Sequence, residues 1–540
     1  MSTNKSIPPL RLRSAMSKTA GPSLQHPHRH IAKSASVISL ATVASRILGF
    51  IRDILIAKLF GTASHAQAFV VAFRIPNLLR DLVGEGATNS AVVPVFSEYL
   101  AQKKKEEFWK LFNVVLNLFL IFSAIITILG IAFTPLIVRL IAPGFTSQPE
   151  KLLLTIKLTR IMFPYLILIG LTAYSMGILF TFKSFFTPAF SPCLLNIAMI
   201  FSAVIAASRM QEPVVGLAIG VVVGGVLQLA FQIPALYKKG MVLSRVKKFS
   251  HPGAKKIGRL LLPRIFGSAV YQLNLVIDTI CASLASVVGE GSIAAIYYAN
   301  RVVQFPLGVF GIALASVILP TMSGYAANKD MDKLKQTLAF SLRSIFLVML
   351  PCGIILLVFS EPIIKILFQR GEFNSYSTQI TSRALLFYAL GLFAYSGVKI
   401  LVSAFYSLQD TVTPVKVATI SLIVNVVLNF TLMWPLKVGG IALASAISAT
   451  VNYFMLYHML EKRMGKLAKG LRQYFIKVAI AASLMGLFLV LIWHNLFLGY
   501  HLILRFAVSS FLGVLIFIAA CLLLEIGEMK KLISWLLNKG

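Results

Sequence analysis

The sequence predicts an all-α polytopic membrane protein with fourteen transmembrane helices. Three observations predict this class. Apolar residues make up 58% of the 540-residue chain and charged residues only 13%, whereas about a quarter of the residues of a soluble protein are charged. The apolar residues gather in runs that reach the roughly 20 helical residues needed to cross a bilayer. Basic residues exceed acidic ones, giving a net charge of +33, and they cluster between these runs, as cytoplasmic loops do.

The same composition excludes several classes of protein. Nucleic-acid-binding chains are basic but polar, and this chain is strongly apolar. The four cysteines stand singly inside apolar runs without CxxC or Cys/His spacing, so we expect buried apolar side chains rather than a disulfide scaffold or a zinc site; they are Cys193, Cys281, Cys352 and Cys521.

The chain begins with a polar segment, residues 1–33, which is basic and contains no acidic residue. We expect a disordered cytoplasmic tail. No apolar segment with a small-residue cleavage site follows, so no signal peptide is predicted, and either Met1 or Met16 could be the start. A metal site at His26, His28 and His30 is the alternative to a solvated tail.

Fourteen apolar runs follow the tail. The second, seventh and eighth runs are interrupted by proline, glycine and charged residues, so a simple hydropathy count would miss them. The predicted spans are 34–60, 65–99, 109–138, 152–182, 187–208, 213–237, 260–287, 292–322, 337–368, 379–407, 413–434, 438–460, 473–494 and 502–524.

The loop charges predict the orientation. Eight Lys or Arg residues and no acid lie in the linker 238–259, and further basic clusters occur at 103–105, 329–335 and 462–472. With fourteen crossings, these clusters all fall on the side of both termini. Both termini are therefore predicted to be cytoplasmic.

An internal repeat divides the chain. Pro94-x-x-Ser97-x-Tyr99 and Thr187-Pro188 recur 226 residues later, and Gly216-Leu-Ala-Ile resembles Gly440-Ile-Ala-Leu at an offset of 224. The period covers six crossings, which predicts two parallel six-helix lobes with the substrate between them. The expected units are an N-lobe at 34–259 that includes the linker, a C-lobe at 260–465, and two further helices with the C-terminus at 466–540.

Ionisable residues inside the predicted spans are the candidate functional residues, because each costs about 2.5–3.5 kcal/mol at the bilayer centre and normally faces a cavity. In the first span, Arg46, Gly49 and Asp53 share one helix face, and Arg52 lies about 120° away. In the second, Arg74, Asn77 and Asp81 share a face, with Arg80 and Glu85 nearby. The eighth span adds Arg301.

Arginine outnumbers acid in this set, so we expect the arginines to surround a cavity that binds an anion. The planar guanidinium matches phosphate oxygens, which predicts a phosphate-bearing substrate. The alternative is internal pairing of the arginines with Asp53, Asp81 and Asp278 for packing.

At these residues the chain resembles the MurJ/MviN lipid II flippases of the MOP exporter superfamily. The resemblance covers most of residues 34–524. It is carried by Ser45-Arg46-x-Leu48-Gly49-Phe50-x-Arg52-Asp53, Ala72-Phe73-x-x-Pro76-Asn77-Leu78-Leu79-Arg80, Glu85-Gly86-Ala87, Pro94-x-x-Ser97-Glu98-Tyr99 and Asn300-Arg301…Phe305-Pro306-x-Gly308.

The resemblance implies fourteen helices in a bacterial cytoplasmic membrane. It also implies that undecaprenyl-pyrophosphoryl disaccharide-pentapeptide (lipid II) moves from the inner to the outer leaflet for cell-wall synthesis. By this resemblance Arg46, Arg52, Asp53, Arg80 and Arg301 are the substrate-binding residues, and we expect Arg74, Asn77 and Glu85 to support them. Two positions depart from the family pattern, because Gln67 and Asn300 stand where acids are common.

Other functions remain as alternatives. A related MOP exporter of drugs or of another polyprenyl-linked sugar is the nearest. A membrane enzyme would need a catalytic acid or histidine cluster, and no ATP-binding G-x-x-x-x-G-K-[ST] motif occurs. We therefore expect a transporter rather than an enzyme, a channel or a scaffold. We expect it to bind no nucleic acid and to act as a monomer.

The last two helices and the energy source are separate expectations. The spans at 473–494 and 502–524 are predicted to supply an apolar groove for the polyprenyl tail, with peripheral anchoring as the alternative. No cofactor is expected except, as a second interpretation, a sodium ion held by Asp278, Asn425 and Asn429, whose oxygens suit a hard cation. Otherwise the membrane potential would drive the cycle.

Overall fold

The computed structural model describes residues 26–83, 85–102, 105–244, 246, 249–467, 470–495 and 499–537, and the described elements are all helices. The first part of the chain forms α1 (His26–Phe60), α2 (Ser64–Val83), α3 (Glu85–Ala101), α4 (Lys105–Ala132), α5 (Thr134–Ile141), the 3-10 helix η1 (Pro143–Ser147), α6 (Pro149–Met162), α7 (Tyr165–Thr181), α8 (Phe186–Arg209) and α9 (Pro213–Lys238).

The remaining part forms a second series of helices. These are α10 (Pro252–Ser283), α11 (Ala285–Val288), α12 (Ser292–Pro306), the π-helix η2 (Leu307–Ile312), α13 (Ala313–Ala327), α14 (Met331–Val358), α15 (Ser360–Phe368), α16 (Ser375–Leu390), α17 (Leu392–Ser407), α18 (Val412–Leu436), α19 (Val438–Met464), α20 (Leu471–Asn495), α21 (Leu502–Leu523) and α22 (Gly527–Leu537).

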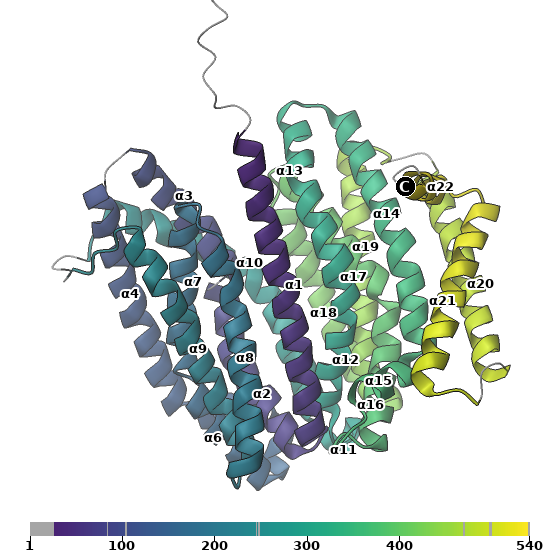
Figure 1. Ribbon diagram of the computed structural model, residues 1–540, viewed down its shortest axis with the longest axis horizontal. Helices are drawn as coiled ribbons and strands as arrows, with labels where there is room; N and C mark the ends of the chain where they lie inside the picture. Colours follow the sequence, from purple (N-terminus) through teal and green to yellow (C-terminus); the bar gives the residue numbers. More distant parts are fainter. Residues whose placement is uncertain are drawn as a thin grey trace, which may run out of the picture.

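Figure 1 shows α1 running between two groups of helices, with α4 and α7–α9 on one side and α13, α14 and α17–α19 on the other. The pair α20–α21 lies at the outer edge beyond α14. Aromatic contacts join this pair to its neighbours, because Phe475 lies 4.2 Å from Phe346 and Trp493 lies 5.0 Å from Phe359 between ring centroids.

Ten helices or helical stretches in the described part of the chain are long and apolar enough to span a membrane, and the pair α16–α17, bent by 46°, makes an eleventh. Their outward side chains are apolar, as on α4, where Ile121, Phe122, Ile125 and Ile128 are exposed. The other predicted spans, 34–60, 65–99 and 260–287, are helical too. The count of fourteen crossings and the cytoplasmic termini stay predictions.

Two of the helices differ from the predicted spans. The described part of the first helix runs from His26, eight residues before the predicted span. Residues 26–33 of the expected tail therefore belong to a helix. In the eighth predicted span, α-geometry gives way to the π-helix η2 directly after Pro306.

The sequence repeat corresponds to matched local structure. Lys183 and Gln409, 226 residues apart, both have positive φ, 56° and 59°, just before α8 and α18. In the helix pair α8–α9, a Cβ on Gly216 would collide with Ala206, and in α18–α19 a Cβ on Gly440 would collide with the backbone of Leu432. The repeated glycines thus lie where paired helices approach closely, as small residues do in membrane proteins.

Replacing Gly440 by alanine should therefore destabilise the protein by about 1–3 kcal/mol, because the new methyl group meets backbone that cannot swing aside. Gly324→Ala is the matched control, since no atom lies within 4 Å of its added Cβ and alanine favours a helix. Thermal unfolding of the purified protein in detergent measures both. Equal melting temperatures for the two variants would contradict the close approach at Gly440.

Candidate functional site

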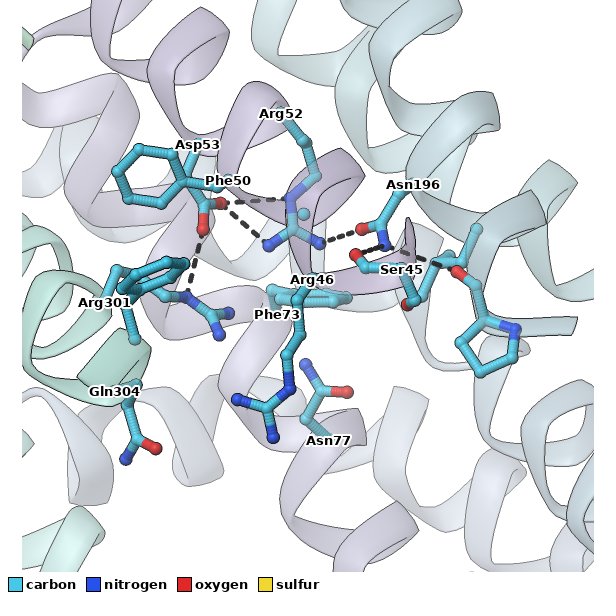
Figure 2. A pocket seen from close by; sticks show the side chains of 14 residues that line it. Ser45, Arg46, Phe50, Arg52, Asp53, Phe73, Asn77, Asn196, Arg301 and Gln304 are labelled. Carbon is cyan, nitrogen blue, oxygen red and sulfur yellow. Dashed lines mark hydrogen bonds and ion pairs between the residues drawn. The ribbon is translucent and has the colours of Figure 1, made fainter. Parts of the chain in front are cut away.

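A pocket of about 280 Å³ lies between α1, α2, α8 and α12. Figure 2 shows that its polar side chains come from helices far apart in the sequence, with Arg52 and Arg301 at Asp53 and with Arg46, Asn77 and Gln304 farther from it. The pocket is lined by Ser45, Arg46, Gly49, Phe50, Arg52 and Asp53 of α1, Phe73 and Asn77 of α2, Pro192, Leu195 and Asn196 of α8, and Arg301, Gln304 and Phe305 of α12.

The carboxylate of Asp53 is the centre of the site and is only 1% exposed. Arg52 donates to its Oδ1 through Nε at 3.0 Å and Nη2 at 2.8 Å. Arg301 forms an ion pair with the other oxygen, with Nε 3.0 Å from Oδ2. Asp53 therefore joins α1 to α12 through two guanidinium groups. A buried carboxylate persists in a protein only with such compensation.

Arg52 is also held from α8. Its Nη1 donates to Asn196 Oδ1 at 2.9 Å, and the amide nitrogen of Asn196 donates to the backbone oxygen of Ser45 at 3.1 Å. The arginine is buried, with 5% of its surface exposed. Asn196 thus holds both the Arg52 guanidinium and the α1 backbone at Ser45, two turns before Arg52.

The phenolic hydroxyl of Tyr297 completes the centre. It donates to Asp53 Oδ1 at 2.9 Å and accepts from Nη2 of Arg52 at 3.3 Å and Nη2 of Arg301 at 3.1 Å. The guanidinium of Arg301 also lies over the Tyr297 ring, 4.9 Å from its centroid. Arg301 remains 40% exposed at its side chain, so it can still contact a ligand in the pocket.

Arg46 lies in α1, six residues before Arg52. Its side chain is exposed and lines the pocket. Its guanidinium lies directly against Gly308 of η2, where any Cβ would collide with it. Three guanidinium groups and one carboxylate line the pocket, which leaves a surplus of two positive charges. Such a surplus in a low-dielectric site attracts an anion.

The supporting residues are placed unevenly. Asn77 lines the pocket, but Arg74 points to α10, where it donates to the Leu275 backbone oxygen at 3.1 Å and to the Thr279 hydroxyl. The side chains of Arg80, Asp81 and Glu85 lie outside the described part of the structure, so their predicted roles stay predictions.

Sequence reasoning missed Asn196, Tyr297 and Gln304. Asn196 is a lone polar residue in an apolar run of α8, which was the available signal. Tyr297 lies one turn before Arg301 on the same helix face, a spacing at which side chains meet. Neither could be connected with Asp53 without the packing of α8 and α12 on α1.

The structure brings Asp278, Asn425 and Asn429 together from α10 and α18. The Asn429 amide nitrogen donates to Asp278 Oδ1 at 2.8 Å and to Asn425 Oδ1 at 2.9 Å, and the Ser445 hydroxyl donates to Asp278 Oδ2 at 3.1 Å. The Asn429 oxygen Oδ1 is buried and has no hydrogen-bond partner among the described residues, so the sodium site stays a prediction. Among the described residues, no group of three or more His, Cys, Asp or Glu side chains could hold a metal ion.

A second polar cluster closes the end of the molecule where α1 is followed by α2. Glu290, before α12, accepts from Gln67 at 2.6 Å and from Lys151 at 2.7 Å on Oε1, and from Gln148 at 3.1 Å on Oε2. Burial raises the pKa of Glu290, but the hydrogen bonds from Lys151, Gln148 and Gln67 and the charge of Lys151 together lower it below its ordinary value, so the carboxylate stays ionised. Gln67 of α2 therefore has a carboxylate beside it, which comes from the loop before α12.

Comparison with known proteins places this geometry in a family. The sequence model of the lipid II flippase MurJ family matches residues 56–511. The chain belongs to the MurJ family. A probable lipid II flippase MurJ of Buchnera aphidicola is 36% identical, covering 85% of this chain and 89% of that protein. The lipid II flippase MurJ of Burkholderia cenocepacia is also 36% identical, over 83% of this chain and 87% of that protein.

Solved structures agree with the family assignment. A lipid II flippase MurJ in an inward closed conformation superposes with a TM-score of 0.78 and 28% identity, covering 92% of this chain and 99% of that one. An inward-facing MATE transporter of the MOP superfamily has a TM-score of 0.64 and 16% identity, over 78% and 95% of the chains, which is a likeness of fold. This MurJ family member is therefore a multi-pass inner-membrane protein.

The Arg52–Asp53 pair should behave as one unit in stability measurements. Asp53→Ala leaves the buried Arg52 guanidinium without its carboxylate, and Arg52→Ala leaves the buried carboxylate without this guanidinium. Each variant should lower the free energy of unfolding by about 3–5 kcal/mol, because a buried charge is left unpaired. The double variant should lose less free energy of unfolding than the sum of the two single losses, because the two residues are in contact and their effects are coupled. Arg46→Ala is the control, since Arg46 is exposed and should change stability little. Additive losses in melting experiments would refute the coupling.

Proposed function

We propose that the protein moves lipid II, the polyprenyl-linked peptidoglycan precursor, from the inner to the outer leaflet of the cytoplasmic membrane. The observation that carries this proposal is the surplus of guanidinium groups around a buried carboxylate in a pocket between helices of both repeats. The relatives at 36% identity are named lipid II flippases or probable ones. A basic pocket is the opposite of what a cationic drug requires.

The pyrophosphate of the substrate binds Arg52 and Arg301. Arginine donates two parallel N–H bonds to phosphate oxygens, and Arg301 has an exposed side chain for this contact. Arg46, on the same wall, adds charge, and Asn77 and Gln304 offer hydrogen bonds to the sugar or peptide. Arg80 is included among the substrate-binding residues because it matches an arginine of the MurJ family pattern.

Transport proceeds by alternating access between an N-lobe at 34–259 and a C-lobe at 260–465, with fourteen crossings and cytoplasmic termini. The contacts of Glu290 with Gln67, Gln148 and Lys151 hold these lobes together at one end. Opening toward the outer leaflet requires these hydrogen bonds to break. The protein acts as a monomeric transporter and performs no enzymatic step on its substrate.

The polyprenyl tail runs in an apolar groove supplied by α20 and α21. Support comes from their exposed side chains, which are apolar along the helices; they include Ile476, Ile480, Leu484, Leu487 and Leu491 on α20 and Ile503, Phe511 and Leu515 on α21. A long hydrocarbon chain cannot enter the charged pocket without a large desolvation cost to its arginines.

Arg52→Ala and Arg301→Ala should each abolish lipid II transport in vesicles and fail to support growth of cells depleted of the native flippase. Lysine at either position should restore transport only in part, because it lacks the bidentate donor geometry. Arg370→Ala is the matched control, since Arg370 is exposed and bonds its own helix at Ile366. Normal transport by both alanine variants, with membrane levels equal to wild type, would rule out these arginines as the pyrophosphate site.

The membrane potential drives the cycle, because one charge moved through 100 mV gains about 2.3 kcal/mol, which is enough to return a positively charged empty pocket to the cytoplasmic side. Support comes from the surplus charge of the pocket and from the Asn429 amide, which occupies the oxygens of Asp278 and Asn425.

Proteoliposomes separate the two energy sources. With sodium equal on both sides, collapsing the potential should reduce transport strongly, whereas removing sodium at constant potential should leave its rate within about twofold. Asp278→Asn is a useful companion variant, because it removes the single carboxylate among these oxygens. Transport that follows the sodium gradient and ignores the potential would overturn this account.

A further inference from the structure

Tyr297 is not among the residues that line the pocket, but its hydroxyl contacts three charged groups that are. A phenolic hydroxyl has one hydrogen to donate and two lone pairs to accept. Here the hydrogen goes to Asp53 Oδ1 at 2.9 Å, and the lone pairs accept from Arg52 at 3.3 Å and from Arg301 at 3.1 Å. The hydroxyl is therefore fully satisfied by these three charged groups, which it joins through one neutral atom.

This arrangement fixes the two guanidinium groups relative to each other. Arg52 is buried and is held by Asp53 and Asn196. Arg301 is 40% exposed and long, and it is held by the Asp53 carboxylate, the Tyr297 hydroxyl and the face of the Tyr297 ring at 4.9 Å. Without the hydroxyl, Arg301 keeps the ion pair and the ring contact but loses the common atom that links it to Arg52.

We propose that the Tyr297 hydroxyl is a positioning residue that sets the spacing of Arg52 and Arg301 and so makes the pocket select a diphosphate over a single phosphate. The inference rests on the proposed function and deepens it. A diphosphate contacts both guanidinium groups at once and gains from their being preorganised. A single phosphate needs only one of them and gains nothing from their spacing.

The test compares binding of inorganic pyrophosphate and inorganic phosphate to the purified full-length protein by calorimetry at one ionic strength. Tyr297→Phe keeps the ring, its packing and its contact with the guanidinium, and removes only the hydroxyl. We expect its affinity for pyrophosphate to fall by roughly 3- to 10-fold, the cost of ordering one long side chain, while its affinity for phosphate changes less than about twofold. The selectivity for pyrophosphate falls by the same factor.

Tyr298→Phe is the matched control. Tyr298 is the next residue on α12, is fully buried, and donates to the backbone oxygen of Gly61 at 3.3 Å, away from the pocket. Its selectivity should equal that of the wild type. Melting temperatures of both variants without ligand check that the fold is intact.

Each result decides the matter. An unchanged selectivity in Tyr297→Phe, or an equal loss of affinity for both anions, would overturn the positioning role, because a merely structural change weakens both. If wild-type protein selects pyrophosphate and loses it in Arg301→Ala but not in Tyr297→Phe, the proposed function stands and only this inference fails. If the wild type binds neither anion, the pyrophosphate pocket itself is wrong.

Discussion

The burial of one carboxylate, Asp53, is the constraint on which the pocket depends. With 1% of its surface exposed, it needs cationic and hydroxyl partners, and these come from two helices separated by more than 200 residues. The pairing links α12 to α1 through long side chains and brings Arg52 and Arg301 to the same carboxylate. Because two guanidinium groups pair with one carboxylate, the ion pairs that link the helices also leave the cavity with a positive charge. The link between the helices and the positive charge of the cavity thus have a common origin.

Much of this could be predicted from the sequence. The apolar runs predicted helices, and the charges at Arg46, Arg52, Asp53 and Arg301 predicted a shared cavity, because an isolated charge in a spanning helix is too costly to face lipid. Helix phase alone, however, could not tell that Arg74 turns to α10 while Asn77 lines the pocket, since both share a face. That distinction depends on which neighbour packs at each turn.

The polar residues without charge were harder to assign. Asn196 and Tyr297 look from the sequence like ordinary members of apolar helices, and their roles depend on partners 144 and 244 residues away. Asn425 and Asn429 were recognised as a pair one turn apart, but the sequence could not say whether their oxygens would face a cation or an amide. The structure places the Asn429 nitrogen between the oxygens of Asp278 and Asn425, and the Asn429–Asp278 hydrogen bond links α18 to α10.

The π-helix η2 has a consequence for the register of the eighth predicted span. A π-turn holds more residues than an α-turn over a similar rise, so each inserted residue rotates the following helix by about 100° relative to the preceding one. The side chains of α13 are therefore out of phase with those of α12. Arg301 on α12 faces the pocket, and Met322 on α13 is buried in the core. The π-helix thus lets one span turn one face to the pocket before it and a different face to the helix bundle after it.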